Sequence, residues 1–311
     1  MKLYGIWVAQ NEADILRHTF DFHRRTRHFD RIFFYDLGSE DDTLEIAREY
    51  ADIADVERRR TPYSGELRVA LMDEHRDRYA PGDWVAIIDS DEIYAEDPRA
   101  AIRAAEAERA TRIETWQAQY YFTDLDLAAW ERGDAAWRAT SAYERLKHYV
   151  VNWSEMRFYK ALAPAGGRTS VVDLDGKLAS RKLLNRHFPY RSPEQIGEKV
   201  RVRLANRKTG LNTQYQIFSE DWRRYVVDHR LLHRDDGVIR FGVPEGVDWK
   251  SFYNFWANDA ASWKNPVYNN WYIYWLMVHG FLPRWSPPEM ALKAVGKAVQ
   301  RIRGRHQVAR A

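Results

Sequence analysis

The chain has 311 residues, 45% of them hydrophobic, and its 48 basic and 45 acidic side chains give a formal net charge of +3. This composition supports one large domain, or a domain with an appendage, and the near balance of charge does not imply a polyelectrolyte partner for the whole chain. The absence of cysteine excludes disulfides, thiolate metal sites and cysteine nucleophiles, and fits a reducing cytoplasm. The first residues lack the features of a signal peptide, and no uncharged run reaches the roughly 18 residues that cross a bilayer. We therefore expect a cytoplasmic protein.

Apolar runs alternate with helical patterns through the first ninety residues or so. The pattern predicts strands at residues 3–8, 31–35, 54–58 and 84–88, with helices at 13–23, 43–50 and 66–79. Alternation at this spacing is typical of a parallel, doubly wound α/β sheet. Later residues predict helices at 98–110 and 192–206, strands at 113–123 and 155–160, and a turn at 164–167, while 130–145 is ambiguous.

Three carboxylates, Asp89, Asp91 and Glu92, close the fourth predicted strand. Open α/β sheets bind their ligands at the carboxyl ends of such strands. In an extended segment Asp89 and Asp91 point to the same side, so their like charges need a compensating cation. Oxygen ligands at this spacing suit Mg²⁺ or Mn²⁺, which in turn bridge phosphate oxygens. A solvated acidic corner is the alternative for an isolated Asp-x-Asp, and the rest of the chain favours the metal site.

Further polar candidates follow the first two predicted strands and precede the last predicted helix. Asn11 and Asp36 are placed to contact a nucleoside, although either is equally a helix-capping residue. His187 is a candidate third metal ligand, while Arg191 and Lys199 are candidates to neutralise a departing diphosphate. A structural histidine and an ordinary helix start are the alternatives for this late segment.

Four stretches in this order resemble glycosyltransferase family 2 enzymes of the GT-A fold: residues 11–16, 34–43, 84–92 and 187–195. The resemblance implies a Rossmann-like, mixed but mainly parallel sheet flanked by helices. We divide the chain into a GT-A domain at 1–240 and an aromatic-rich, basic helical region at 241–311. Leu37 departs from the family pattern, since many members have Asp or Asn at that position.

The resemblance also implies roles for individual residues. Asp91 would bind the divalent ion and Asp36 the nucleoside, with Asp89 near the ribose or the metal. His187, Arg191 and Lys199 would then lie on the side of the diphosphate and the metal.

The activity implied is metal-dependent transfer of a sugar from a nucleotide-sugar donor to an acceptor hydroxyl, in glycan or polysaccharide synthesis. Mn²⁺ or Mg²⁺ would be the cofactor, and inversion is implied by the resemblance alone. An inverting transfer needs a carboxylate near the acceptor hydroxyl, and the Glu-Asp pair that usually supplies it is not recognisable here. The candidates are Glu155, Asp124 and Asp173, with Glu155 first because it precedes Arg157 in a strand-like run.

Two alternatives belong to other classes. A haloacid-dehalogenase-type phosphatase also has a strand ending in Asp-x-Asp, but that strand comes first in such enzymes, and Ile93 stands where Thr or Val is usual. A non-catalytic binding module for nucleic acid or anionic lipid would use the aromatic cluster at 249–285 and the basic tail. Core packing with an acceptor cleft also explains the cluster. A solvated end, or peripheral contact with the inner face of a membrane that presents a lipid-linked acceptor, also explains the tail.

Overall fold

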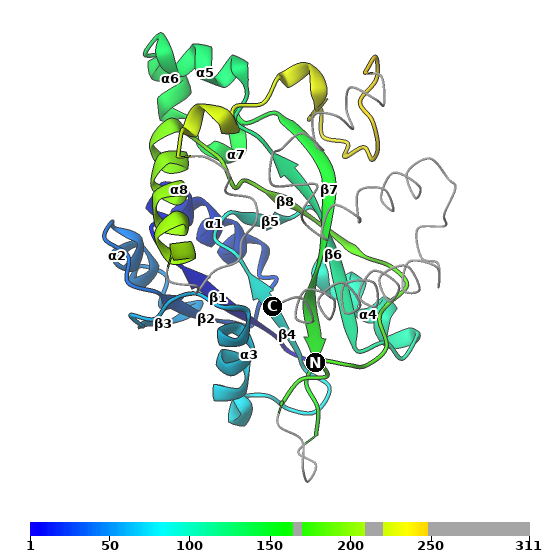
Figure 1. Cartoon of the computed structure of the whole chain (residues 1–311). Coiled ribbons are helices and arrows are strands. Elements are labelled where there is room, and N and C mark those ends of the chain that lie inside the picture. The colour runs from blue at the N-terminus through cyan, green and yellow to red at the C-terminus, as the bar shows by residue number, and fades with distance from the viewer. Residues whose placement is uncertain (164–169, 209–219, 248–311) are drawn as a thin grey trace, which may run out of the picture.

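The computed structural model describes residues 1–163, 170–208 and 220–247. In these ranges nine strands form one mixed sheet in the order β3-β2-β1-β4-β7-β6-β8-β5, and β9 pairs with β7 (Figure 1). The strands are β1 Leu3–Ala9, β2 Arg31–Asp36, β3 Ala54–Arg58, β4 Trp84–Ile88, β5 Glu92–Tyr94, β6 Arg112–Tyr120, β7 His148–Lys160, β8 Leu183–His187 and β9 His233–Arg234. The α-helices are α1 Ala13–Thr26, α2 Thr43–Arg48, α3 Gly65–Glu74, α4 Pro98–Ala107, α5 Asp124–Glu131, α6 Ala135–Ala139, α7 Ala142–Arg145 and α8 Pro193–Lys208.

Strands β3, β2, β1 and β4 are parallel to one another. β1 pairs with β2 on one side and with β4 on the other, so the strand order reverses between β1 and β4. The carboxyl ends of these two strands meet at that reversal, which is where open α/β sheets bind ligands. Asn11 and Glu12 follow β1 there, and Asp89 follows β4.

The other half of the sheet is mixed. β7 runs antiparallel to β4 and to β6, whereas β8 runs parallel to β6 and antiparallel to β5. As a result, His187 at the end of β8 lies opposite Glu92 on β5 and Gln119 on β6. The late sequence motif is thereby brought beside the acidic end of β4.

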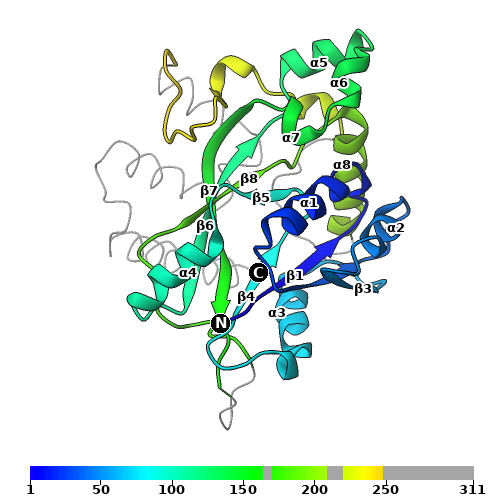
Figure 2. The same ribbon diagram turned by 180° about the vertical axis from the view of Figure 1, so that it is seen from behind.

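Alternate residues of the parallel strands enter different hydrophobic clusters, because successive side chains of a strand point to opposite faces. Trp7 and Trp84 pack with residues of α1, α2 and α4, whereas Ile6 and Val85 pack with Leu71 of α3. Helices α1, α2 and α4 therefore cover one face of the sheet and α3 the other (Figures 1 and 2). A third cluster joins β6, β7, α8 and the segment at 222–247.

Local sequence explains several helix starts. Asp97 accepts a hydrogen bond from the Arg99 N–H, and Pro98 takes the first helical position of α4. Thr123 and Asp126 form a reciprocal capping box at the start of α5. Each pair satisfies backbone donors that the first turn of a helix leaves without partners.

The GT-A fold class is confirmed. The elements that were predicted differ from the structure mainly in their ends, but strands β5, β8 and β9 were not predicted. The helix expected at 66–79 stops at Glu74 and continues as a short 3-10 turn, Arg76–Arg78. The ambiguous stretch at 130–145 contains the end of α5 and two short helices. Residues 164–167 and most of 241–311 lie outside the described residues. None of the described helices has the length and apolar character needed to cross a bilayer.

Candidate active site

The chain turns directly after β4. The Glu92 N–H donates to the Asp89 carbonyl at 3.2 Å, so this segment is a turn and not the extended run expected from its sequence. The turn sends the two aspartates to different neighbours: Asp89 faces β7, whereas Asp91 faces the end of β8 and α8.

Ser90, between the two aspartates, is clamped by three side chains. The Trp7 indole donates to Ser90 Oγ at 2.9 Å, and the Thr19 hydroxyl donates to the Ser90 carbonyl at 2.5 Å. Thr19 also lies 2.6 Å from the Tyr143 hydroxyl. Strand β1 and helices α1 and α7 therefore fix the turn that presents Asp91.

Asp91 is buried among cationic and imidazole groups. Its Oδ2 lies 3.1 Å from Lys199 Nζ and 3.5 Å from Arg191 Nη1, and its Oδ1 lies 3.4 Å from His187 Nε2. Burial alone would raise the pKa of Asp91, but Lys199, His187 and Arg191 outweigh it and hold that pKa well below its usual value. Asp91 is therefore a carboxylate at any pH near neutrality.

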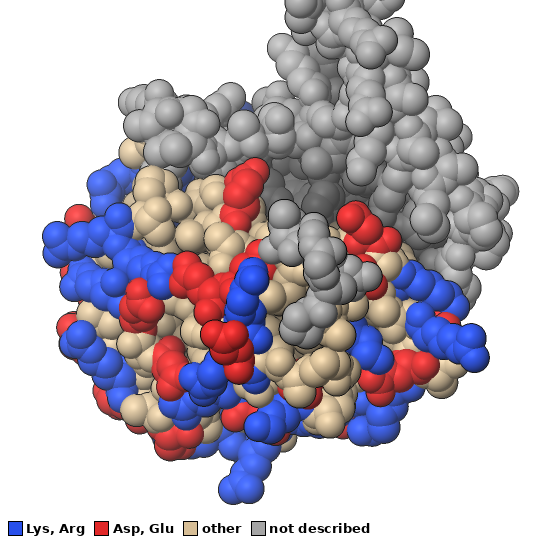
Figure 3. All heavy atoms as spheres, turned by 90° about the horizontal axis from the view of Figure 1, so that it is seen from below, with Lys and Arg blue, Asp and Glu red and all other residues tan. Residues whose placement is uncertain are grey.

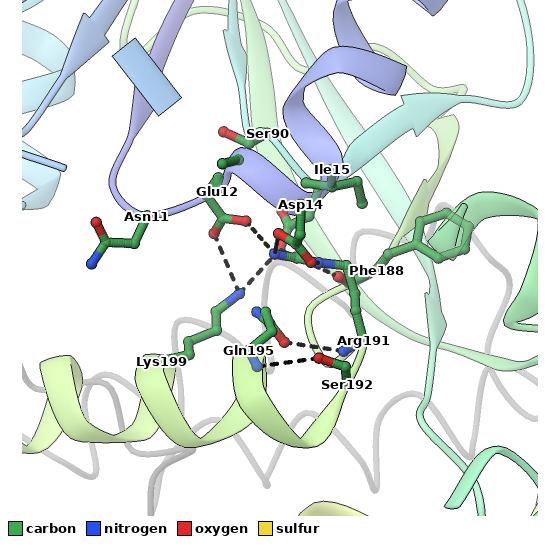
Figure 4. Close-up of polar contacts among 12 residues, drawn as sticks. Asn11, Glu12, Asp14, Ile15, Ser90, Phe188, Arg191, Ser192, Gln195 and Lys199 are labelled. Carbon is green, nitrogen blue, oxygen red and sulfur yellow. Dashed lines mark hydrogen bonds and ion pairs between the residues drawn. The ribbon is translucent and has the colours of Figure 1, made fainter. Parts of the chain in front are cut away.

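Arg191 contacts Asp91 and also joins the loop before α8 to Glu12 and Asp14 at the start of α1, as Figure 4 shows. It forms two hydrogen bonds with Asp14, one of 2.6 Å with Glu12 and one of 3.0 Å with the Phe188 carbonyl. Glu12 lies between Arg191 and Lys199 in Figure 4. The Arg191 side chain has no exposed surface, so it holds its neighbours in place and does not reach solvent.

A second charged group, which we call the Arg157 cluster, consists of Arg157, Asp89, Glu92 and Glu155. Arg157 Nη2 lies 2.7 Å from Asp89 Oδ2, 2.6 Å from Glu92 Oε1 and 2.7 Å from Glu155 Oε2. Arg68 also pairs with Asp89. Burial raises the pKa of Glu92 well above its usual value, and the nearby carboxylates add to this against the attraction of Arg157.

The loops that follow β1 and β2 are closed by their own polar side chains. Asn11 adopts a positive φ of 55°, and its side chain accepts a hydrogen bond from the Glu40 N–H at 2.8 Å. Asp36 is 0% exposed, accepts from the Ser39 N–H at 3.0 Å and pairs with Arg58 at 3.2 Å. Leu37 is buried in the cluster beneath α3, which explains why an apolar residue fits at this position. Both loops lie at the ligand edge of the sheet, where Asp36 fixes the shape of its turn.

The family model described as glycosyl transferase family 2 matches residues 6–186, which is more than half of the chain. The chain belongs to glycosyl transferase family 2. No curated protein sequence matches it. Membership in this family favours glycosyl transfer over the phosphatase that the Asp-x-Asp motif also suggested.

Two solved structures illustrate its similarity to other proteins. TarS from S. aureus, residues 1–349, is 15% identical over 71% of this chain and 70% of that chain, with a TM-score of 0.36. Glucosyl-3-phosphoglycerate synthase from Mycobacterium tuberculosis, in complex with Mn²⁺ and UDP-glucose, is 23% identical over 37% of this chain and 43% of that chain, with a TM-score of 0.28.

The residues of this family 2 domain offer two places for a divalent ion at the carboxyl end of β4. Two ligands about 2.1 Å from one ion and at right angles to each other lie roughly 3 Å apart, which is close to the 3.4 Å between Asp91 Oδ1 and His187 Nε2. Oxygens of Asp89, Glu92 and Glu155 also lie within 4.8 Å of one another, but Arg157 Nη2 already contacts all three. Asp91 and His187 therefore fit an ion better than the Arg157 cluster does.

A third acidic group is remote from these residues. Asp124 pairs with the His229 ring at 2.9 Å and accepts from the His229 backbone at 2.8 Å, with Asp228 nearby. These contacts join the start of α5 to the segment at 228–231. We infer that the contacts of Asp124 with His229 stabilise the fold.

The three candidate catalytic bases lie in different parts of the molecule. Glu155 joins Asp89 in the Arg157 cluster, and its side chain is 42% exposed. Asp124 contacts His229 instead. The Asp173 N–H donates to the Lys160 carbonyl, and Lys160 pairs with Trp84 at the start of β4, so Asp173 lies at the opposite edge of the sheet. Of the three, the structure brings Glu155 beside the acidic end of β4.

Sequence reasoning did not assign roles to Glu12, Asp14, Glu92 or Arg157. Glu12 belongs to the motif after β1, and nothing in the sequence indicated that it is the partner of Arg191. Arg157 left a usable signal, because an arginine inside a predicted strand must find carboxylates if that strand is buried. Its three partners are separated from it by 2 to 68 residues, and no local pattern predicts that convergence.

Proposed function

We propose that this family 2 glycosyltransferase is metal-dependent and inverting, and that it transfers a sugar from a nucleotide-sugar donor to an acceptor hydroxyl in glycan or polysaccharide synthesis. Family membership supports the glycosyl transfer. The observation that supports the metal site is the pair formed by Asp91 and His187 at 3.4 Å, near the carboxyl end of β4 where the strand order reverses.

Asp91 and His187 would hold Mn²⁺ or Mg²⁺, which offsets the negative charge that grows on the diphosphate as the glycosyl bond breaks. Lys199 lies 3.1 Å from Asp91 and supplies a fixed positive charge on the same side. Arg191 acts by holding Asp91, Glu12 and Asp14. Asn11 and Asp36 are proposed to shape the nucleoside side of the site.

Glu155 is the proposed base. Its half-exposed carboxylate would accept the proton of the acceptor hydroxyl as the oxygen attacks the anomeric carbon. Asp89 belongs to the Arg157 cluster, whereas Asp91, two residues later, contacts Lys199. The turn after β4 therefore joins the two halves of the proposed site.

The first test is a thermal-shift screen of UDP-, GDP- and CMP-sugars with and without Mn²⁺. In the wild type we expect one class of donor to stabilise the protein only when Mn²⁺ is present. Asp91→Asn should lose this shift and lower turnover by about a hundredfold or more, whereas Asp175→Asn, an exposed aspartate, should keep both. An unchanged shift and turnover in Asp91→Asn would refute the metal assignment.

The acceptor is proposed to be a glycan or a lipid-linked sugar, with peripheral membrane contact through the basic residues of 241–311. Liposomes containing anionic lipid should pellet the full chain but not a chain truncated at Pro288. Equal pelleting of the two would refute the membrane contact and leave the transfer reaction unaffected.

A further inference from the structure

We propose that Arg157 is a positioning residue that holds the Glu155 carboxylate in place for the incoming acceptor. The proposal rests on the proposed role of Glu155 as the base. It assigns to a buried arginine on β7 the task of keeping one carboxylate of a crowded acidic group pointed at the substrate.

Carboxylates from three segments converge on one nitrogen atom, Arg157 Nη2. Asp89 follows β4, Glu92 begins β5, and Glu155 lies two residues before Arg157 on β7, where Arg157 is the extra residue at a break in the register with β6. Gln117 on β6 adds a hydrogen bond of 2.8 Å to Glu92 and one of 3.4 Å to Glu155. Arg157 Nη2 is the point that the three carboxylates have in common.

Burial separates the roles of the two β7 residues. The Arg157 side chain is 2% exposed, whereas the Glu155 side chain is 42% exposed. Glu155 can therefore meet a hydroxyl that arrives from solvent, but Arg157 cannot touch the substrate. Arg157 must act through the carboxylates that it contacts.

Electrostatics explain why Glu155 needs this partner. Carboxyl oxygens of Asp89, Glu92 and Glu155 lie within 4.8 Å of one another. The like charges of Asp89 and Glu155 repel strongly at that distance where water is excluded. Glu155 is the most exposed of the three side chains, so it is the one free to swing into solvent. Arg157 removes the repulsion and makes the inward position the stable one.

The contacts also distinguish the two oxygens of Glu155. Among the described residues, Arg157 and Gln117 both contact Oε2. Oε1 is then the oxygen that faces the acceptor and takes its proton.

Arg157→Met tests the proposal, with Arg157→Lys as the conservative variant and Glu155→Gln as the reference for loss of the base. Arg112→Met is the matched control, since Arg112 lies on neighbouring β6 and donates to the carbonyls of Leu174 and Gly176. The assay measures release of nucleoside diphosphate, with water as acceptor, from the nucleotide sugar that the thermal-shift screen selects. Donor binding is followed separately by the Mn²⁺-dependent thermal shift.

We expect Glu155→Gln to lower kcat by about a hundredfold and Arg157→Met to lower it at least tenfold, with the donor KM and the Mn²⁺-dependent shift unchanged in both. Arg157→Lys should recover part of the kcat, and Arg112→Met should keep the wild-type value. If Arg157→Met does not fold, the pair Arg157→Met and Glu92→Gln removes Arg157 together with a buried carboxyl group that contacts it, and this pair is measured against Glu92→Gln alone.

Two results overturn the proposal while leaving the proposed function standing. One is a wild-type kcat in a folded Arg157→Met when Glu155→Gln is impaired. The other is a loss of donor binding that parallels the loss of kcat, because Arg157 would then act through Asp89 on the donor side. A wild-type kcat in Glu155→Gln refutes the base assignment itself, whatever Arg157→Met does.

Discussion

Arg191 holds the carboxylate of Asp14 through two hydrogen bonds, from Nε to Oδ2 at 2.8 Å and from Nη2 to Oδ1 at 2.7 Å. The two residues are 177 positions apart in the chain, so this contact joins the start of α1 to the loop before α8. Because Arg191 Nη1 is also 3.5 Å from Asp91 Oδ2, the same guanidinium stabilises the charge of the proposed metal ligand.

Arg191→Met should therefore lower the free energy of unfolding by about 3–5 kcal/mol, because it leaves buried carboxylates without their cation. Urea unfolding measures this. Asp14→Asn, on a side chain that is 40% exposed, should cost only about 1 kcal/mol. A folded Arg191→Met with wild-type stability and weakened donor binding would instead mean that Arg191 contacts the diphosphate, as the sequence pattern suggested.

Lys199→Met should weaken donor binding without unfolding the protein. Lys199 lies on α8 with Nζ 3.1 Å from Asp91 and 3.1 Å from the Pro189 carbonyl, and its charge is expected to favour a diphosphate by roughly tenfold in affinity. Titration with the nucleoside diphosphate in the presence of Mn²⁺ measures the change. Arg201→Met serves as the control, since Arg201 is an exposed cation on the same helix that pairs with Glu198. Equal losses in the two variants would point to a general charge effect and not to a contact.

Thr19→Val should loosen the turn that carries Asp91. The change leaves the Ser90 carbonyl and the Tyr143 hydroxyl without their shortest hydrogen bonds, at a cost of about 1–3 kcal/mol in urea unfolding. The Mn²⁺-dependent thermal shift should shrink as well, because Asp91 adjoins Ser90. Thr26→Val, near the end of the same helix, removes a hydroxyl that bonds only within α1 and should leave that shift intact. If both variants keep the shift, the clamp on Ser90 does not position the ligand.

His23 should make the fold sensitive to acid. Its ring is buried against Phe29, Trp7 and Tyr94, and burial lowers its pKa to about 3. Below about pH 6.5 the His23 ring binds a proton in the unfolded chain but not in the folded chain. The contribution of His23 to the free energy of unfolding is therefore constant above pH 6.5 and is lost as the pH falls from 6.5 toward 3.

The slope is about 1.4 kcal/mol per pH unit, which gives roughly 2 kcal/mol between pH 6.5 and pH 5. Urea unfolding at pH 7.5 and pH 5.0 should show this loss in the wild type. His23→Phe should lose correspondingly less, whereas His18→Gln, an exposed position on the same helix, should follow the wild type. Identical pH dependence in the wild type and His23→Phe would show that protonation of His23 does not cause the loss of stability in acid.

Alternation of strands and helices predicted the parallel half of the sheet because that half is built from contiguous units. Strands β1 to β4 follow one another in the sequence with one helical segment between each pair, and β1, β2 and β4 have apolar runs long enough to recognise. The acidic end of β4 was recognisable for the same reason. Strand β5 was not, because three residues carry no periodicity and its partner β8 lies about ninety positions later in the sequence.

Side-chain partners were harder to predict than elements. The motif before α8 indicated that His187, Arg191 and Lys199 act together, and the structure does bring them to Asp91. The burial of Arg191 depends on Glu12 and Asp14, which lie near the start of the chain. The sequence alone therefore did not predict that Arg191 is buried. Asp36 is similar, since its burial depends on Arg58 on the neighbouring strand β3.

The reversal of the chain at Asp89–Glu92 has one more consequence. It sends the adjacent carboxyl groups of Asp91 and Glu92 to Lys199 and to Arg157 respectively, so covalent geometry sets the distance between the two charged groups. Inserting or deleting a single amino acid in this hairpin would displace both groups together.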